Sequence, residues 1–176
     1  MPAISKPFIH KTAVVENARI GEGTKIWHFV HIMNGTRIGK HCSIGDYVHM
    51  DRNVVVGDRC KIQNAAILYD GVTIGNDVFI GPSVCFTNDL RPRAFNQDWT
   101  IIKTAVKDGA SIGANATIIC GVTIGRHAMV GAGSVVTEDV PDFGLVYGNP
   151  AHLHGFVCKC GSRVDKAGSS CQKCKK

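Results

Sequence analysis

The chain has 176 residues, of which 44% are hydrophobic, and a formal net charge of +6 at pH 7. A chain of this length suits one domain with at most a small appendage. Residues 1–6 contain no apolar run of the kind that a signal peptide needs, and no stretch approaches the roughly 18 apolar residues of a membrane span. We therefore expect a cytoplasmic protein with no membrane span.

The positive charge is concentrated near the C-terminal end. Residues 158–176 carry a net charge of +5, because six basic side chains are opposed by Asp165 alone: Lys159, Arg163, Lys166, Lys173, Lys175 and Lys176. The other 14 basic and 13 acidic residues give the rest of the chain a net charge of +1. A body so close to neutral has no basic stripe to follow a phosphate backbone, so we expect no nucleic-acid partner.

Large apolar residues return at every sixth position along most of the chain. This column consists of Phe8, Val14, Ile20, Ile26, Ile32, Ile38, Ile44, Met50, Val56, Ile62, Leu68, Ile74, Ile80, Phe86, and then Val106, Ile112, Ile118, Ile124, Val130 and Val136. Small or β-branched residues form a second column four positions after the first, from Thr12 to Val84 and from Ala110 to Val140. Glycines, Gly57 among them, directly follow many members of the first column.

A period of six cannot be the stripe of an α-helix, because six residues turn about 600° and leave successive members about 240° apart. The glycines instead indicate a short strand and a tight bend within each six-residue unit. Such units stack into a parallel β-helix. We therefore predict an all-β solenoid.

This pattern resembles the hexapeptide-repeat acyltransferases over roughly residues 8–140. The resemblance implies their left-handed parallel β-helix, with three six-residue units in each coil. The step from Phe86 to Val106 is not a multiple of six, so we expect a loop inserted at about 87–105, on the binding face. We also expect a cap at about 141–157 that closes a domain of residues 1–157, followed by a separate tail at 158–176.

Several segments resemble one branch of that family, the acetyltransferases of nucleotide-linked 3-amino sugars. They are IWHFVHI at 26–32, CKIQN at 60–64, FIGPS at 79–83, FTN at 86–88 with PR at 92–93, and GASIGANAT at 109–117. The resemblance implies transfer of acetyl from acetyl-CoA to the amine of a UDP- or dTDP-linked sugar used for surface polysaccharides. It also implies a homotrimer with each active site between two adjacent solenoids.

The inserted loop would cover the sugar in such an arrangement. In the resembling enzymes the asparagine of the FTN segment lies in the active site, and here it is Asn88. Asparagine cannot act as a base, so it can only orient the amine while the departing thiolate takes the proton. Asp89 is the candidate for a true base, or it braces the loop against Arg91 or Arg93. These two arginines either bind the diphosphate or form a salt bridge within the loop.

Further binding residues are expected at the bends. His28 and His31 lie at bend or outward positions, where their rings meet either a ligand or a neighbouring subunit. Asn64 also lies at a bend, where an asparagine often simply caps the turn. The resemblance places the pantetheine arm of the coenzyme along the small residues after the loop, where backbone N–H groups are exposed: Gly113, Ala114, Gly131, Ala132 and Gly133.

The tail holds four of the eight cysteines: Cys158, Cys160, Cys171 and Cys174. Thiols of a cytosolic chain stay reduced, so the cluster indicates metal ligands before disulfides. Two pairs of thiolates look like the halves of a zinc ribbon and suit a structural, tetrahedral Zn²⁺. The first pair has one intervening residue where two are standard, which strains joint ligation. His152 or His154 is then an alternative ligand, and a metal-free, disordered basic tail is the other interpretation.

Two other functions remain open at this point. An O-acetyltransferase acting on a sugar or small hydroxyl acceptor usually needs a histidine base, and residues 87–105 contain none, which favours an amine acceptor. A metal-binding solenoid of the γ-carbonic-anhydrase type would need three histidines between subunits, for which His28, His31 and His49 are the candidates.

Overall fold

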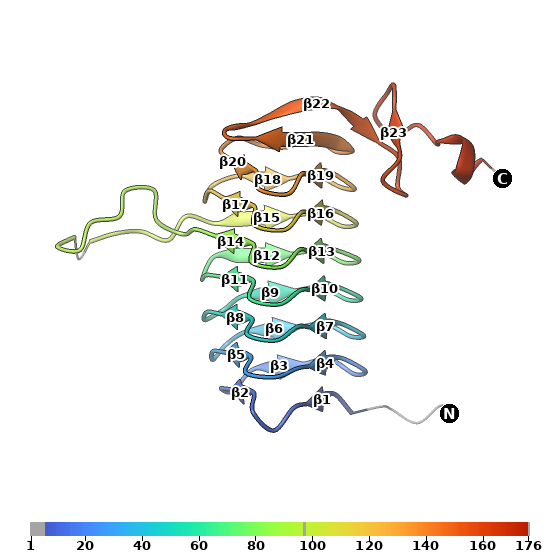
Figure 1. The fold of residues 1–176 in the computed structure, drawn as a ribbon. Coiled ribbons are helices and arrows are strands. Elements are labelled where there is room, and N and C mark those ends of the chain that lie inside the picture. The colour runs from blue at the N-terminus through green and yellow to red at the C-terminus, as the bar shows by residue number, and fades with distance from the viewer. Residues whose placement is uncertain (1–5, 97, 176) are drawn as a thin grey trace.

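The computed structural model describes residues 6–96 and 98–175. These residues form a solenoid of short parallel strands stacked along one axis, with one loop and a C-terminal tail projecting from it (Figure 1). Apart from the 3₁₀ turn η1 at Gln172–Cys174, this part of the chain contains no helix, and hence none that could cross a membrane. The prediction of an all-β parallel β-helix is confirmed.

Each coil passes through three sheets in turn, so neighbouring strands in a sheet come from successive coils. The ten-stranded sheet contains β1 (Phe8–Ile9), β4 (Lys25–Ile26), β7 (Ser43–Ile44), β10 (Lys61–Ile62), β13 (Phe79–Ile80), β16 (Ser111–Ile112), β19 (Met129–Val130), β21 (Gly144–Gly148), β22 (Ala151–Val157) and β23 (Arg163–Val164). The seven-stranded sheet contains β2 (Val14–Val15), β5 (His31–Ile32), β8 (His49–Met50), β11 (Ile67–Leu68), β14 (Cys85–Phe86), β17 (Thr117–Ile118) and β20 (Val135–Val136). The six-stranded sheet contains β3 (Arg19–Ile20), β6 (Arg37–Ile38), β9 (Val55–Val56), β12 (Val72–Ile74), β15 (Thr104–Val106) and β18 (Thr123–Ile124).

The bends between sheets form three edges of the prism. We call the bend from the ten- to the seven-stranded sheet the first corner, which includes residues 27–30, 45–48 and 63–66. The second corner leads to the six-stranded sheet and includes residues 33–36 and 51–54. The third corner returns to the ten-stranded sheet and includes residues 39–42, 57–60 and 75–78.

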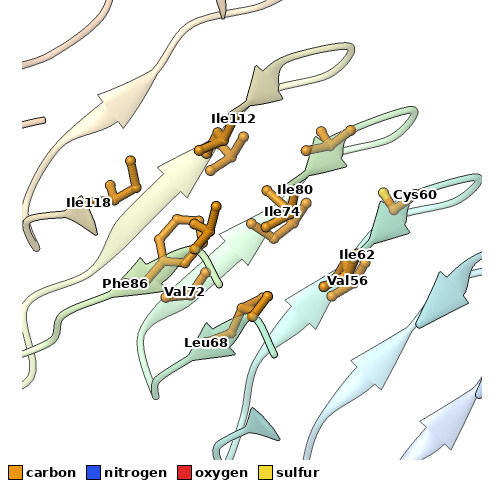
Figure 2. Close-up of a cluster of buried hydrophobic side chains, with 14 of the residues drawn as sticks. Val56, Cys60, Ile62, Leu68, Val72, Ile74, Ile80, Phe86, Ile112 and Ile118 are labelled. Atoms are coloured by element: carbon orange, nitrogen blue, oxygen red, sulfur yellow. The ribbon is translucent and has the colours of Figure 1, made fainter. Parts of the chain in front are cut away.

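The sixth-position column points into the prism. From Ile26 onward its members are buried, and Ile62, Leu68 and Phe86 are 0% exposed. Figure 2 shows these side chains meeting from all three sheets along the axis. Each such side chain stabilises the fold by roughly 1.5–3 kcal/mol relative to an exposed one, so the repeat itself supplies the core.

The predicted column is wrong in the first coil. Ile9, not Phe8, pairs with Ile26, and Val15 pairs with Ile32. Phe8 and Ile9 are 46% and 42% exposed, since both lie in the end coil. The cause is a turn between Val15 and Ile20 that is one residue shorter than the repeat, because Ile20 still pairs with Ile38 in the expected register. One missing residue moves the preceding side chains to the opposite face of their strands.

The glycines after the column serve close packing between coils. A Cβ on Gly57 would lie 2.7 Å from the carbonyl carbon and oxygen of Gly75 in the next coil. The positive φ angles occur further into the bends, often on residues with side chains, such as Tyr47 at +59° and Ala65 at +59°. The bends that the sequence predicts are therefore present, but the regular spacing of the glycines reflects the closeness of neighbouring coils.

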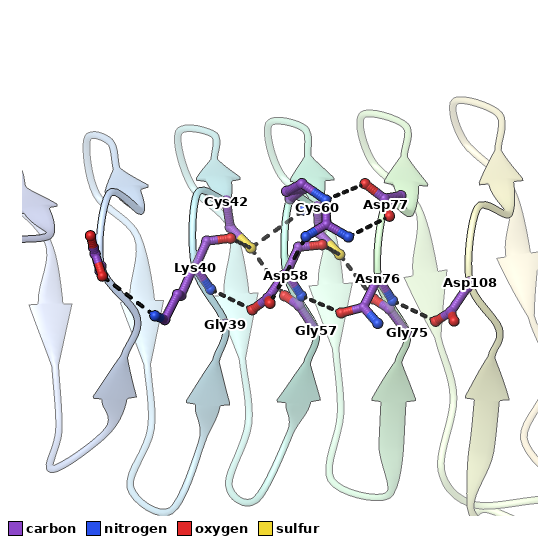
Figure 3. A network of polar contacts seen from close by, with 12 residues as sticks. Gly39, Lys40, Cys42, Gly57, Asp58, Cys60, Gly75, Asn76, Asp77 and Asp108 are labelled. Carbon is purple, nitrogen blue, oxygen red and sulfur yellow. Dashed lines mark hydrogen bonds and ion pairs between the residues drawn. The ribbon is translucent and has the colours of Figure 1, made fainter. Parts of the chain in front are cut away.

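A ladder of side-chain amides and carboxylates links the coils at the third corner (Figure 3). The Lys40 N–H donates to Asp58 Oδ1 at 2.7 Å and the Asp58 N–H donates to Asn76 Oδ1 at 2.8 Å. The Asn76 N–H continues the ladder to Asp108 Oδ1 at 2.7 Å. The backbone donors of Lys40, Asp58 and Asn76 are thus each satisfied by a side chain of the coil above.

The C-terminal strands extend the ten-stranded sheet. β21 continues it in parallel beside β19, and β22 and β23 then add to it in antiparallel orientation. The cap expected at about 141–157 corresponds to β21 and β22. Because β23 lies within the tail, the tail is hydrogen-bonded to the cap at Phe156 and Val157.

Candidate functional site

The inserted loop leaves the solenoid at the second corner, between β14 and β15. Its neck is closed by the backbone N–H of Ile102, which donates to the carbonyl of Asn88 at 3.1 Å. The preceding residue, Thr87, is tied to the next coil, since its hydroxyl accepts the N–H of Cys120 at 2.9 Å. Asn88 is thereby fixed at the base of the loop. Its amide side chain has no hydrogen-bond partner among residues 6–96 and 98–175.

The loop folds around a hollow of about 400 Å³ lined by Asp89, Arg91 and Trp99. Asp89 Oδ1 accepts the N–H of Arg91 at 2.7 Å, so this carboxylate caps the turn that carries the arginine. Arg93 donates from Nη1 to the carbonyl of Pro92 at 2.7 Å. Within the described residues, neither arginine forms an ion pair with Asp89. Asp89 therefore braces the loop through the backbone N–H of Arg91 and not through a guanidinium group. The side chains of Arg91 and Arg93 remain exposed to solvent.

His28 and Asn64 lie together at the first corner, around a hollow of about 250 Å³ that Trp27 also lines. Asp46 lies between them. Its Oδ1 accepts the His28 backbone N–H at 2.9 Å and lies 2.9 Å from His28 Nδ1. Asn64 Oδ1 in turn accepts the Asp46 N–H at 3.1 Å. The same kind of ladder as at the third corner thus holds these three residues, with one further contact to an imidazole ring.

The electrostatics of this hollow are set by Asp46. The hydrogen bond from the His28 backbone, then that from the His28 ring, lower the pKa of the Asp46 carboxyl from its ordinary value of 3.8. Asp46 is therefore ionised at neutral pH and draws the Nδ1 proton of His28 toward itself. The ring of His10 lies 3.9 Å from the ring of His28, centroid to centroid, and covers it from the coil below.

Asp46 was absent from the sequence-based candidates. The signal was available, because Asp46 follows His28 by three six-residue units and so occupies the same position one coil later. Asn64 stands another coil further along. A histidine, a carboxylate and an amide at equivalent positions of three successive coils must lie side by side along one corner.

His31 lies on the outer face of the seven-stranded sheet, away from the first corner. Its Nε2 lies 2.6 Å from Glu16 Oε1, and its ring lies 5.3 Å from that of His49. The structure therefore separates His31 from His28 and Asn64 within one chain. It brings His31 and His49 together, but His28 belongs to another face.

The expected coenzyme ridge continues the first corner above Asn64. Ala114 and Ala132 take the positions that His28 and Asp46 hold in the lower coils, after Pro82. None of these three side chains can accept a hydrogen bond, so the ladder ends there. In the described part of the chain the backbone N–H groups of Asn64, Ala114 and Ala132 consequently have no partner.

The glycines of the ridge differ from these alanines. The N–H groups of Gly113 and Gly131 donate to the next coil at 2.8 Å, and that of Gly133 donates to Ala114 at 2.8 Å. A Cβ on Gly133 would meet no atom within 4 Å, so open space lies beside it. Among the expected coenzyme residues, the backbone donors available to a ligand are therefore those of Ala114 and Ala132.

The four tail cysteines converge. Their sulfur atoms all lie within 4.8 Å of one another, and they are the group of candidate metal ligands found among the described residues. The alternative ligand His154 instead stacks on Tyr147 with ring centroids 3.6 Å apart. The one-residue spacing of Cys158 and Cys160 therefore does not keep the two sulfur atoms apart.

Comparison with known families gives two matches. The model of the bacterial transferase hexapeptide (six repeats) matches residues 17–52, 53–88 and 103–138, which is more than half of the chain. The gap between the last two stretches falls on the inserted loop. The model of the hexapeptide repeat of succinyl-transferase matches residues 35–70.

Individual relatives are also similar. A dTDP-3-amino-3,6-dideoxy-α-D-galactopyranose 3-N-acetyltransferase of Aneurinibacillus thermoaerophilus is 47% identical over 157 residues, 89% of this chain and 82% of the relative. The structure of a hexapeptide-repeat-containing acetyltransferase of Vibrio cholerae is 32% identical with a TM-score of 0.53, over 78% of this chain and 73% of that chain. The acetyltransferase domain of PglB of Neisseria gonorrhoeae, in complex with acetyl coenzyme A, shares the fold at 24% identity and a TM-score of 0.55, over 84% of this chain and 57% of that chain.

Proposed function

The chain belongs to the family of bacterial hexapeptide-repeat transferases, and we propose that it moves the acetyl group of acetyl-CoA to the 3-amine of a dTDP-linked 3-amino-3,6-dideoxyhexose. One observation carries the proposal, namely the 47% identity to the Aneurinibacillus N-acetyltransferase over 89% of the chain. A match over 157 of the 176 residues extends well beyond any single coil of the solenoid. Because acetyl-CoA and nucleotide sugars are cytoplasmic metabolites, the proposal places the enzyme in the cytoplasm.

The first corner offers a surface for the pantetheine arm of the coenzyme. Ala114 and Ala132 present backbone N–H groups that no other described residue uses, one coil apart on a smooth edge. The arm is extended and carries two amide carbonyls, which need such donors when they leave water. The open space beside Gly133 leaves room for it. In this proposal Gly113 and Gly131 allow neighbouring coils to pack closely at this edge. Their N–H groups do not bind the ligand, because they already donate to the next coil.

The active site would be shared between subunits. Asn88 lies at the second corner, whereas His28, Asn64 and the ridge lie at the first. Two corners of one prism face in different directions, so one chain cannot close both groups around a single ligand. Figure 1 shows the loop extending away from its own solenoid, as it would to reach a neighbour. We therefore assign a homotrimer in which the second corner of each subunit meets the first corner of the next.

The chemistry assigned to Asn88 is orientation. In the transfer step the lone pair of the neutral sugar amine attacks the thioester carbonyl carbon, and the carbon–sulfur bond then breaks. The amine proton passes to the departing CoA thiolate, which leaves as the thiol. The Asn88 amide oxygen can accept a hydrogen bond from the amine and so hold its lone pair toward the thioester, which lowers the entropic part of the barrier. Asp89 is occupied as a turn cap and takes a supporting part.

The remaining candidates would recognise the substrate. Arg91 and Arg93 carry exposed guanidinium groups on the loop, where they can donate charge-assisted hydrogen bonds to the diphosphate. His28, Asn64 and Trp27 form a hollow with polar atoms beside an aromatic face, which suits a sugar or a nucleobase.

One observation favours a second candidate function, O-acetylation of a hydroxyl acceptor. Asp46 holds the Nδ1 side of His28, an arrangement that leaves Nε2 free to take a proton from an alcohol. The loop lacks a histidine, but the first corner of a neighbouring subunit would supply one. Product chemistry separates the two candidates, because an amide resists hydroxylamine and an ester does not.

The test is acetyl transfer with the purified protein. Acetyl-CoA is mixed with a dTDP-linked 3-amino-3,6-dideoxyhexose, its UDP-linked counterpart, a dTDP-linked 4-amino sugar, and serine as a hydroxyl acceptor. Thiol release and product mass are followed together. We expect the fastest release with the dTDP-linked 3-amino sugar and a product that resists hydroxylamine. Release with serine alone, or with none of the acceptors, would refute the proposal.

A further inference from the structure

The tail places four thiols around one point outside the solenoid. All four sulfur atoms lie within 4.8 Å of one another, and those of Cys160 and Cys171 are 3.4 Å apart. A tetrahedral Zn²⁺ with four Zn–S bonds of about 2.3 Å needs sulfur atoms about 3.8 Å apart. The observed sulfur–sulfur distances lie on both sides of this value, so small side-chain movements would bring the four sulfur atoms into tetrahedral geometry around one ion. Since all four thiols are free, none is committed to a disulfide.

Each pair of cysteines lies on a turn of the same kind. The Gly161 N–H donates to the Cys158 carbonyl at 2.8 Å, which closes a four-residue turn around Cys160. The Cys174 N–H donates to the Cys171 carbonyl at 3.0 Å and closes the second turn. A tight turn aims two nearby side chains at a common point, and this explains how one intervening residue is enough for the first pair.

The surroundings of the cluster favour a negatively charged centre. Four thiolates and one Zn²⁺ carry a net charge of −2. The segment 158–176 has a net charge of +5 from its other side chains, so a bound ion with its thiolates leaves the tail at about +3. The thiolate is the form of cysteine that binds metal.

Little else holds the end of the tail in place. The first turn is anchored, because Cys158 is 3% exposed and the Val157 N–H donates to the Phe143 carbonyl at 2.8 Å. Residues 165–168 and 172–175, by contrast, are exposed, and the backbone hydrogen bonds at Ser169 and Cys174 are local. A segment this short cannot form a hydrophobic core and ordinarily needs a staple.

We propose that Cys158, Cys160, Cys171 and Cys174 bind one structural Zn²⁺, which fastens the end of the tail to the cap of the solenoid. The ion closes the chain between the two turns and supplies folding free energy to the tail, as zinc does in small domains. The tail is anchored at Phe143, beside the third corner, whereas the acetyl-transfer candidates lie at the first and second corners.

The test measures metal content, which does not depend on activity. The full chain and two variants are purified with a reductant, loaded with Zn²⁺, dialysed, and analysed by elemental mass spectrometry. We expect close to one zinc per chain in the wild type and in Cys85→Ser, whose thiol is in the solenoid, and almost none in Cys174→Ser. Zinc kept by Cys174→Ser would place the ion elsewhere, for example on the histidines, and would overturn the proposal.

Two further readouts identify the ion and its ligands. Co²⁺ in place of Zn²⁺ should give the intense visible and thiolate charge-transfer bands of a four-thiolate tetrahedral site, and Cys160→Ser should weaken them. Trypsin should cut at Lys166 and Lys173 faster after metal removal than before. Iron rather than zinc in the wild type, or disulfides among these four cysteines under reducing conditions, would contradict the proposal.

Discussion

The Nδ1 atom of His28 lies 2.9 Å from Oδ1 of Asp46 in the next coil, and the same oxygen accepts the His28 backbone N–H at 2.9 Å. These two hydrogen bonds lower the pKa of Asp46. A depressed carboxyl pKa adds stability above the ordinary value of 3.8, and this stability is lost as the pH falls through the folded-state pKa. The contact therefore contributes at neutral pH and disappears in acid.

The change Asp46→Asn keeps an oxygen for the backbone N–H but removes the charge that faces the histidine. We expect the melting temperature at pH 7 to fall by a few degrees, and the gap to the wild type to close below pH 4. Calorimetry from pH 3 to pH 8 measures this. Asp108→Asn is the matched variant, because Asp108 caps Asn76 in the same way and forms no ion pair among the described residues. A gap for Asp46→Asn that persists in acid would show that the charge is not responsible.

Asn88 supplies the second prediction. Asn88→Ala keeps the backbone bond to Ile102 that closes the loop, yet removes the amide that we assign to the amine. Turnover should fall by about one to three orders of magnitude, in line with the loss of a well-placed polar contact, with the unfolding midpoint nearly unchanged. Asn34→Ala, which is exposed at the same corner in a lower coil, should keep full turnover. Unchanged turnover in Asn88→Ala would remove this residue from the mechanism.

The sequence predicts the solenoid well because each six-residue unit repeats the same pattern of residues. A buried isoleucine such as Ile62 and a glycine such as Gly57 recur at fixed spacing, so many weak signals agree. The prediction fails at Phe8, where a single shortened turn shifts the register and no neighbouring coil below corrects it. Period alone cannot reveal a one-residue deletion at the end of the array.

The site was less predictable because it depends on contacts between coils and between chains. Asp46 could be found by counting one coil from His28, but the ending of the ladder at Pro82 becomes visible only when the backbone donors are traced. Asn88 and His28 lie at different corners, and a sequence gives no sign of which corners meet in an assembly. The cysteine cluster was predictable in composition, while its turns were not.

Gly57 is a closely packed glycine and Ala65 is a bend residue with a positive φ. Substitutions at the two positions should change the free energy of unfolding in different directions. A methyl group on Gly57 would lie 2.7 Å from backbone atoms of Gly75, which cannot move without opening the coil. Gly57→Ala should lower the free energy of unfolding by about 1–3 kcal/mol. Ala65, exposed with φ at +59°, pays about 1–2 kcal/mol for this backbone conformation. Ala65→Gly should therefore be neutral or stabilising by up to about 1 kcal/mol, since glycine also loses more chain entropy. Urea unfolding measures both, and a destabilised Ala65→Gly would contradict this account.

Cys42 and Cys60 form a thiol ladder inside the third corner, shown in Figure 3. The Cys42 thiol donates to the Gly57 carbonyl at 3.1 Å, the Cys60 thiol donates to the Gly75 carbonyl at 3.0 Å, and the Cys60 N–H donates to Cys42 Sγ at 3.4 Å. Contact with the Cys42 side chain, and then burial, raise the pKa of Cys60. Cys42 and Cys60 are 2% and 0% exposed, respectively.

The side-chain hydrogen bond with Cys60 lowers the pKa of Cys42 to about 7, so burial and not protonation protects this thiol. Both thiols should therefore resist alkylation in the folded protein, because no reagent reaches them. With iodoacetamide at pH 8, mass spectrometry should find Cys42 and Cys60 unmodified until denaturant is added. Removal of metal should expose Cys160 and Cys174 first, since both are on the surface of the tail. Cys85, partly buried with a pKa raised by burial, should react at an intermediate rate. Labelling of Cys60 before Cys85 would mean that the solenoid opens at the third corner, which the continuous ladder from Lys40 to Asp108 argues against.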